Sequence, residues 1–76
     1  GVTKLSLTAS TVRGTLELLE ETQPALYRNV CDETGKVRRH INVFVNTANT
    51  RDLATGLDTA LAPGDVVTIL PAVSGG

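Results

Sequence analysis

Apolar and polar residues alternate most clearly in VRRHINVFVN, residues 37–46, and this alternation predicts a β-strand with one buried face. The face expected to be buried carries three aliphatic residues, Ile41, Val43 and Val45. The opposite face carries His40, Asn42, Phe44 and Asn46. Phe44 is therefore a large apolar side chain on a face that is otherwise typical of a solvated surface.

Two shorter segments alternate in the same way and complete the predicted strands. On one side of KLSLTA, residues 4–9, lie Leu5, Leu7 and Ala9. VVTILPAV, residues 66–73, is predicted to turn inward Val67 and Ile69. Its outward residues are Val66, Thr68 and Leu70. If this strand is the neighbour of the 37–46 strand, Val66 and Leu70 share the outward face with Phe44.

Between the first two strands the apolar spacing changes to that of a helix. STVRGTLELLEETQP, residues 10–24, carries apolar residues on one side, at Val12, Leu16 and Leu19. Ser10 or Thr11 can cap the start of this helix, because hydroxyl side chains accept hydrogen bonds from its free N–H groups. Pro24 is expected to end it, because proline lacks an N–H and disfavours helical angles in the preceding residue.

The remaining segments are predicted as turns and irregular structure. Leu26 and Val30 are expected to pack from a short irregular turn after the helix. DETG, residues 32–35, and APGD, residues 62–65, have turn composition. The segment between the last two strands is expected to anchor to the core, as a short helix or loop, through Leu53, Leu57 and Leu61. This order of elements predicts an α+β fold, although three strands make a thin floor for the helix.

Composition narrows the class of protein. The 76 residues suffice for one domain, and 41% hydrophobic with 20% charged residues argues against global disorder. Seven basic and eight acidic side chains give a net charge of −1, which does not favour a partner such as nucleic acid or an anionic membrane. The one basic cluster, KVRR at residues 36–39, is interpreted as a solvated strand edge rather than a phosphate site.

The expected compartment is the cytoplasm. A single cysteine, Cys31, excludes an internal disulfide and suits a reducing environment. No apolar run approaches the roughly 20 residues of a membrane span, and no signal peptide is visible.

No candidate reactive residue lies in a catalytic motif. Cys31 could act as a nucleophile with His40 as its base, but an inert thiol is the favoured interpretation. Turn roles explain the acidic residues better than a metal site does, at Asp32, Glu33 and Asp65. The glycines are scattered and form no phosphate-binding loop, at Gly14, Gly35, Gly56 and Gly64. The chain is therefore not expected to be an enzyme.

GDVVTILPAVSGG, residues 64–76, resembles the C-terminal signature of the ubiquitin-like sulfur carrier proteins, the ThiS/MoaD-like family. TVRGTLELLEE resembles the helix of that family and INVFVN its strand before a variable loop. Within the family, the resemblance is strongest to the carrier used in cysteine synthesis. The motifs that carry it are GK-x-x-R/H, then VFVN followed by an Arg, and then VTILPAV. The resemblance implies a β-grasp fold, a mixed sheet with one main helix across one face. It implies a domain over residues 1–73 and a flexible reactive tail over residues 74–76.

One departure from the family pattern concerns the start of the fold. A β-grasp opens with a strand hairpin, and TKLSLTAS, residues 3–10, aligns with its second strand. The first strand, which lies beside the C-terminal strand, is not found, so the C-terminal strand is expected to lack a partner unless another segment fills the slot. We therefore expect the sequence to be incomplete at its N-terminus.

The resemblance implies that Gly76 is the functional residue. An E1-like enzyme would use ATP and Mg²⁺ to adenylate its carboxylate, and sulfur would then replace the adenylate to give a thiocarboxylate. The carrier would bind no cofactor. Ser74 and Gly75 would be recognised with the tail, since glycine lets a partner approach the backbone closely. The docking surface implied is the outward face with Phe44 and Leu70, together with Val66.

The implied partners are enzymes that charge or discharge the tail. They are an E1-like adenylyltransferase or sulfurtransferase, a PLP-dependent synthase similar to cysteine synthase, and a metalloprotease that processes the C-terminus. Two alternatives stay open. The first is the small subunit of molybdopterin synthase, with the large subunit of that enzyme as its partner, or a carrier in another sulfur-transfer pathway. The second is a ubiquitin-like modifier that is joined to lysines of target proteins. Higher-mass conjugates would favour the modifier, and stable co-purification with a large subunit would favour molybdopterin synthase.

Overall fold

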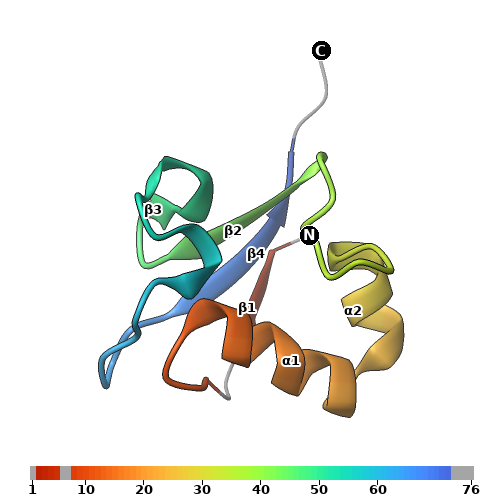
Figure 1. The fold of residues 1–76 in the computed structure, drawn as a ribbon, viewed down its shortest axis with the longest axis horizontal. Coiled ribbons are helices and arrows are strands. Elements are labelled where there is room, and N and C mark those ends of the chain that lie inside the picture. The colour runs from red at the N-terminus through yellow and green to blue at the C-terminus, as the bar shows by residue number, and fades with distance from the viewer. Residues whose placement is uncertain (1, 6–7, 73–76) are drawn as a thin grey trace.

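The strand predicted from the alternating pattern is β2, Ile41–Val45, and its burial alternates in step with the sequence. The structure, a computed structural model, describes residues 2–5 and 8–72. β2 pairs antiparallel with β4, Val67–Pro71, so that the inward residues Val43 and Ile69 lie opposite each other. β1, Thr3–Leu5, and β3, Ala48–Asn49, complete a sheet of order β1-β4-β2-β3 (Figure 1).

The predicted helix is α1, Val12–Thr22, which lies across one face of the sheet. Thr11 caps its start, because the Thr11 hydroxyl accepts a hydrogen bond of 3.0 Å from the N–H of Gly14. Its apolar side is buried as expected, at Val12, Leu16 and Leu19. The helix ends at Gln23, whose backbone leaves helical angles before Pro24.

The irregular turn expected after α1 is instead a second helix, α2, Pro24–Val30. That expectation was wrong because proline, which ends one helix, also suits the first position of the next, where no N–H partner is required. Val30 is buried, and Leu26 and Tyr27 pack half-buried against the core. The helical layer therefore contains two helices, α1 and α2, where the sequence predicted one.

The predicted strand over residues 37–46 is also shorter than expected. The N–H of Arg38 donates to the carbonyl of Val30, and the N–H of Ile41 donates back to the carbonyl of Arg38. These bonds hold residues 37–40 against the end of α2 and in a turn, so the sheet begins at Ile41. The basic cluster KVRR consequently lies in the connection before β2 rather than on a strand edge.

The first strand differs from its prediction in position and in partner. It covers Thr3–Leu5 instead of residues 4–9, and Leu7 lies outside the described residues. β1 pairs antiparallel with β4, placing Leu5 opposite Val67. The position beside the C-terminal strand, which was expected to be empty unless another segment fills it, is therefore occupied by β1.

Ala9, expected in the first strand, instead packs against the first turn of α1. A Cβ placed on Gly14 would lie 2.9 Å from the Cβ of Ala9, so only glycine permits this approach. The N–H of Ala9 donates to the Thr15 hydroxyl at 3.0 Å, which ties the segment to the helix.

The core between helices and sheet is aliphatic, as a chain with one Phe and no Trp requires. Its buried apolar residues are Val12, Leu16, Leu19, Val30, Cys31, Ile41, Val43, Val45, Val67 and Ile69. The segment between β3 and β4 forms two 3₁₀ turns, Thr50–Asp52 and Gly56–Asp58. Leu57 and Leu61 from this region pack against the core as expected, while Leu53 is half-buried. Neither α1 nor α2 has the length and apolar character needed to cross a membrane.

Candidate docking face and tail root

The face of the sheet away from the helices carries the three residues proposed for docking. Phe44 lies opposite Thr68 and Leu70 lies opposite Asn42, so Phe44 and Leu70 are diagonal neighbours on adjacent strands. Both are half-buried, and Val66, just before β4, is 39% exposed. The structure thus brings Phe44, Leu70 and Val66 together on one face.

Asn46 fixes the position of Val66 on this face. Its backbone adopts a left-handed conformation, φ 55°, which asparagine tolerates better than most residues. Its side-chain Oδ1 accepts from the N–H of Val66 at 3.0 Å, and its Nδ2 donates to Asp65 at 3.1 Å. The β2–β3 turn and the turn before β4 are therefore fastened to each other beside the docking residues.

Arg51 and Asn42 form a polar network at the other end of the face, and sequence reasoning did not identify it. One guanidinium nitrogen of Arg51 donates to Asn42 Oδ1 at 2.7 Å, and the other donates to the carbonyl of Arg38 at 2.9 Å. Asn49 also donates to Asn42 Oδ1, at 3.1 Å. Because Asn42 lies opposite Leu70, the network holds a cationic group beside the apolar pair. The only sign of this network in the sequence is the arginine that follows VFVN, which was noted as part of the family resemblance.

The root of the C-terminal tail is held by the turn before β2. Pro71 lies opposite Ile41, and the N–H of Ala72 donates to the carbonyl of His40 at 2.6 Å. Ser74, Gly75 and Gly76, the residues predicted to carry the tail chemistry, lie outside the described residues. The described part of the chain ends at this anchor, at the end of β4 (Figure 1).

Cys31 and His40 do not form the nucleophile and base that the sequence left open. Cys31 is only 2% exposed, and burial raises the pKa of its thiol, which favours the unreactive protonated form. The hollow beside Cys31, about 530 Å³, is lined by Glu20 of α1, residues of α2 and the following turn, and Arg38, and its lining does not include His40. His40 is exposed, and it lines a different hollow.

The acidic residues at the two predicted turns hold those turns. The Asp32 carboxylate accepts from the hydroxyl and N–H of Thr34 and from the N–H of Lys36, and these bonds lower its pKa. The N–H of Ala62 and the amide of Asn46 likewise lower the pKa of Asp65. Glu33 is exposed. Over residues 2–5 and 8–72, no three His, Cys, Asp or Glu side chains are grouped to hold a metal ion.

A sheet with its C-terminal strand inside, crossed on one face by a long helix, is the ubiquitin-like β-grasp architecture expected from the sequence. The crystal structure of Mycobacterium tuberculosis CysO matches with a TM-score of 0.78 at 37% identity, over 91% of this chain and 79% of that chain. A chain of the Amycolatopsis orientalis BexX/CysO complex gives a TM-score of 0.70 at 34% identity, over 95% of this chain and 79% of that chain.

The amino-acid sequence gives the same relationship. The sulfur carrier protein CysO of Mycobacterium tuberculosis is 37% identical over 78 residues, an alignment that covers all of this chain and 83% of the relative. Residues 2–76 match the ThiS family. The chain belongs to the ThiS family, which confirms the family resemblance found in its helix, its central strand and its C-terminal segment.

Proposed function

We propose that this chain is a cytoplasmic sulfur carrier protein whose Gly76 carboxylate is converted to a thiocarboxylate for cysteine synthesis from O-phosphoserine. The observation that carries the proposal is the similarity, at 37% identity over all of this chain and 83% of the relative, to a protein named as the sulfur carrier CysO. The family match extends through residue 76, the second glycine of SGG. The chain acts as a co-substrate, and the enzymes that it visits supply the catalysis.

The anchor at Ala72 suits this role, because it fixes where the tail leaves the body. The Ala72–His40 hydrogen bond and the Pro71–Ile41 pairing hold the backbone up to residue 72. Beyond it, residues 73–76 can span at most about 14 Å when fully extended. A partner must therefore bind close to the tail root to reach the Gly76 carboxylate.

The chemistry proceeds in two displacements at the tail. A carboxylate oxygen of Gly76 attacks the α-phosphorus of ATP, and pyrophosphate leaves as the acyl adenylate forms. Sulfide bound by the partner then attacks the acyl carbon, AMP leaves, and the thiocarboxylate forms with loss of a proton. The activating enzyme supplies Mg²⁺ and the cationic groups that stabilise charge on the phosphates. Gly75 contributes only a backbone that fits a narrow channel.

The outward face provides the surface on which the partners dock. Phe44 and Leu70 form a half-buried apolar pair beside the exposed Val66, and apolar clusters of this kind on small proteins often mark partner sites. The expected partners are the E1-like enzyme, the PLP-dependent sulfur-accepting synthase and, if Gly76 is exposed by cleavage, a metalloprotease.

The proposal is tested by adenylation in vitro. The protein is mixed with ATP, Mg²⁺ and the E1-like enzyme of its own pathway, and pyrophosphate release is measured. We expect release with the full chain and none with a chain lacking Gly76, whose melting temperature stays unchanged. Equal release by both chains would show that Gly76 is not the adenylated residue.

A different sulfur acceptor is the second candidate. One relative named CysO was crystallised in a complex with the protein BexX, so a protein similar to this chain has a partner of that name. Supplying O-phosphoserine with its synthase to the thiocarboxylated protein separates the two: cysteine, whether released or still joined to the Gly76 acyl group, supports the first proposal. Retention of the sulfur would favour another acceptor, molybdopterin synthase among them.

A further inference from the structure

A shallow hollow of about 390 Å³ lies beside the root of the tail. It is lined by Arg28, Asn29, Arg38, His40, Ile41 and Pro71. Two of these residues are arginines, one is a histidine, and none is acidic. Because Pro71 is the last residue of β4, directly before the Ala72 anchor, whatever occupies this hollow lies against the tail root.

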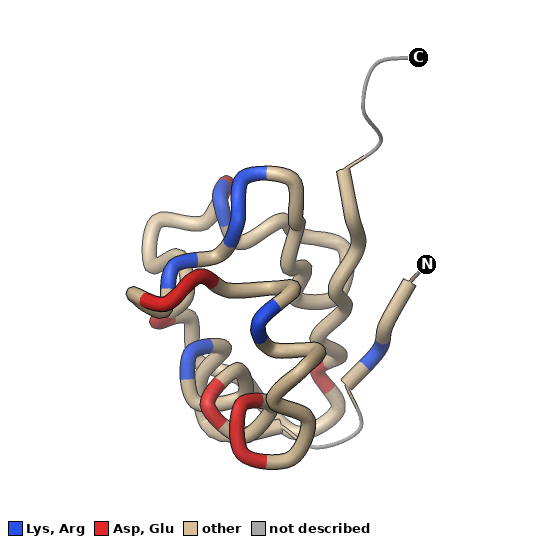
Figure 2. The backbone as a smooth tube through the Cα atoms, turned by 90° about the vertical axis from the view of Figure 1, so that its right-hand side faces the viewer, with Lys and Arg blue, Asp and Glu red and all other residues tan. Residues whose placement is uncertain are grey.

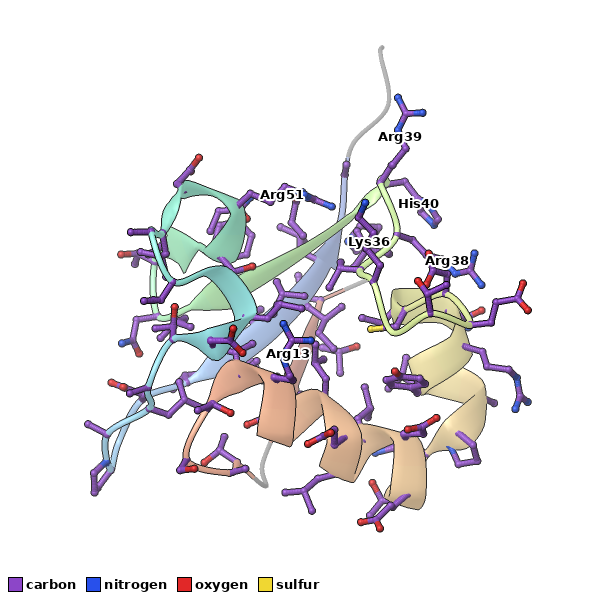
Figure 3. All side chains as sticks on the ribbon, in the orientation of Figure 1. Arg13, Lys36, Arg38, Arg39, His40 and Arg51 are labelled. Carbon is purple, nitrogen blue, oxygen red and sulfur yellow. The ribbon has the colours of Figure 1, made fainter. Side chains whose placement is uncertain are left out.

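Two further arginines extend this basic surface. Arg39 lies in the same turn as His40, and Arg51 reaches toward the end of β4 from the opposite side (Figure 3). We call the group the basic end: Arg28, Arg38, Arg39, His40 and Arg51. It holds four of the seven Lys and Arg residues of the chain.

No arginine of the basic end forms an ion pair with an acidic side chain of the described residues. The one ion pair among the described residues joins Arg13 of α1 to Asp58 of the second 3₁₀ turn, outside the basic end. Helix α1 with its acidic residues lies at the end of the molecule away from the tail root (Figure 2). Glu20 of that helix nevertheless lines the hollow beside Cys31 with Arg28 and Arg38, as do Asp32 and Glu33. By contrast, the hollow beside the tail root is lined by basic residues without an acidic one, although the net charge of the chain is −1.

Part of the basic end is held in place before any partner arrives. Arg51 is fixed by its bonds to Asn42 and to the carbonyl of Arg38. The Nε of Arg38 donates to the carbonyl of Arg28 at 2.8 Å, and its two terminal nitrogens donate to no described residue. Guanidinium groups held in this way lose less side-chain entropy when they bind a carboxylate.

We propose that the basic end binds Asp and Glu side chains on the surface of the enzyme that receives the tail. The identity of that partner rests on the sulfur carrier role proposed above; the acidic chemistry rests on the basic end itself. Arginine pairs with carboxylates through two parallel hydrogen bonds, and a charged surface orients an approaching partner of opposite charge. Nucleic acid is disfavoured, because the net charge of the chain is −1 and three acidic side chains border the hollow that Arg28 and Arg38 also line.

The test compares two variants that change the net charge equally. The double variant R28Q/R39Q removes two positive charges at exposed positions whose side chains make no hydrogen bond to a described residue. The control Q23E/A25E adds two negative charges at exposed positions around the start of α2. Both take the formal charge from −1 to −3, since 5 − 8 and 7 − 10 each equal −3.

Binding to the activating enzyme is measured at low and at high salt. At low salt we expect R28Q/R39Q to bind on the order of tenfold more weakly, from two lost surface charge pairs. The control should bind within about twofold of the unmodified protein, and added salt should narrow the difference. Equal weakening by both variants would overturn the proposal, because only net charge would then matter.

A second titration does not depend on sulfur chemistry. A hexaglutamate peptide is added to isotopically labelled protein, and backbone amide shifts are followed. Shifts confined to the basic end and absent in R28Q/R39Q support the proposal, even if Gly76 proves not to be adenylated. Shifts spread over the surface, no shifts, or tighter binding of inorganic phosphate than of the peptide at equal ionic strength would overturn it.

Discussion

Two neighbouring residues of β2 separate the docking role from the structural one. Val43 points into the core and is 1% exposed, whereas Phe44 lies on the opposite, outward face. Phe44 is also not among the half-buried apolar residues that pack against the core. Replacing each by alanine therefore removes apolar atoms from two different surfaces of one strand.

The expected magnitudes differ in kind. Val43→Ala deletes two buried methyl groups, each worth about 0.8 kcal/mol, and leaves a cavity, for a total loss of about 2–3 kcal/mol in the free energy of unfolding. For a domain of this size, that lowers the melting temperature by roughly 10–20 °C. Phe44→Ala should cost about 1 kcal/mol of stability, but about 2 kcal/mol or more of binding, a loss of roughly thirtyfold in affinity.

The assay measures both quantities on both variants. Urea unfolding gives stability, and calorimetric titration with the activating enzyme gives affinity, at a temperature where each variant is folded. We expect Val43→Ala to bind like the unmodified protein once folded. If Phe44→Ala binds with unchanged affinity, Phe44 is not in the interface and the reasoning from the outward face is refuted.

Three further predictions concern the described fold. Asn46→Ala should lower the free energy of unfolding by about 2 kcal/mol, because two side-chain hydrogen bonds are lost and alanine tolerates the left-handed backbone conformation less well. Thr47→Ala, at the exposed neighbouring position, should change the free energy of unfolding little, and chemical denaturation of both variants compares them. Cys31 should resist iodoacetamide until denaturant is added, and rapid alkylation of the native chain, seen by intact mass, would contradict its burial. Asp32→Asn and Asp65→Asn should each destabilise at neutral pH. Because the folded-state pKa values of both carboxyls are lowered, that difference should shrink as pH falls below about 4, and a constant difference across an acid titration of stability would refute it.

Local patterns in the sequence predicted the elements whose causes are local. The inward and outward residues of β2 and β4 follow from a period of two, and the Thr11 cap and apolar side of α1 follow from helical spacing. α2 was missed because Pro24 was interpreted only as a helix terminator. Proline also suits a helix start, and seven residues carry too little periodicity to reveal one.

Features set by distant partners could not be predicted. The turn before β2 depends on a bond from Arg38 to Val30, and the pairing of β1 with β4 joins the two ends of the chain. The bonds of Arg51 to Asn42 and to the Arg38 carbonyl depend equally on the folded arrangement. The alternating pattern showed only that Phe44 is a large apolar residue on a polar face, and its docking role, like the role of Gly76, came from the family resemblance.

The central claim is that Gly76 carries sulfur, and intact mass spectrometry tests it most directly. The protein is purified from cells that contain its own pathway, and the peptide ending at Gly76 is then fragmented. The account predicts a mass increase equal to the replacement of one oxygen by sulfur, localised to the Gly76 carboxyl. An unmodified Gly76, even after ATP, Mg²⁺, sulfide and the cognate activating enzyme are supplied, would contradict it.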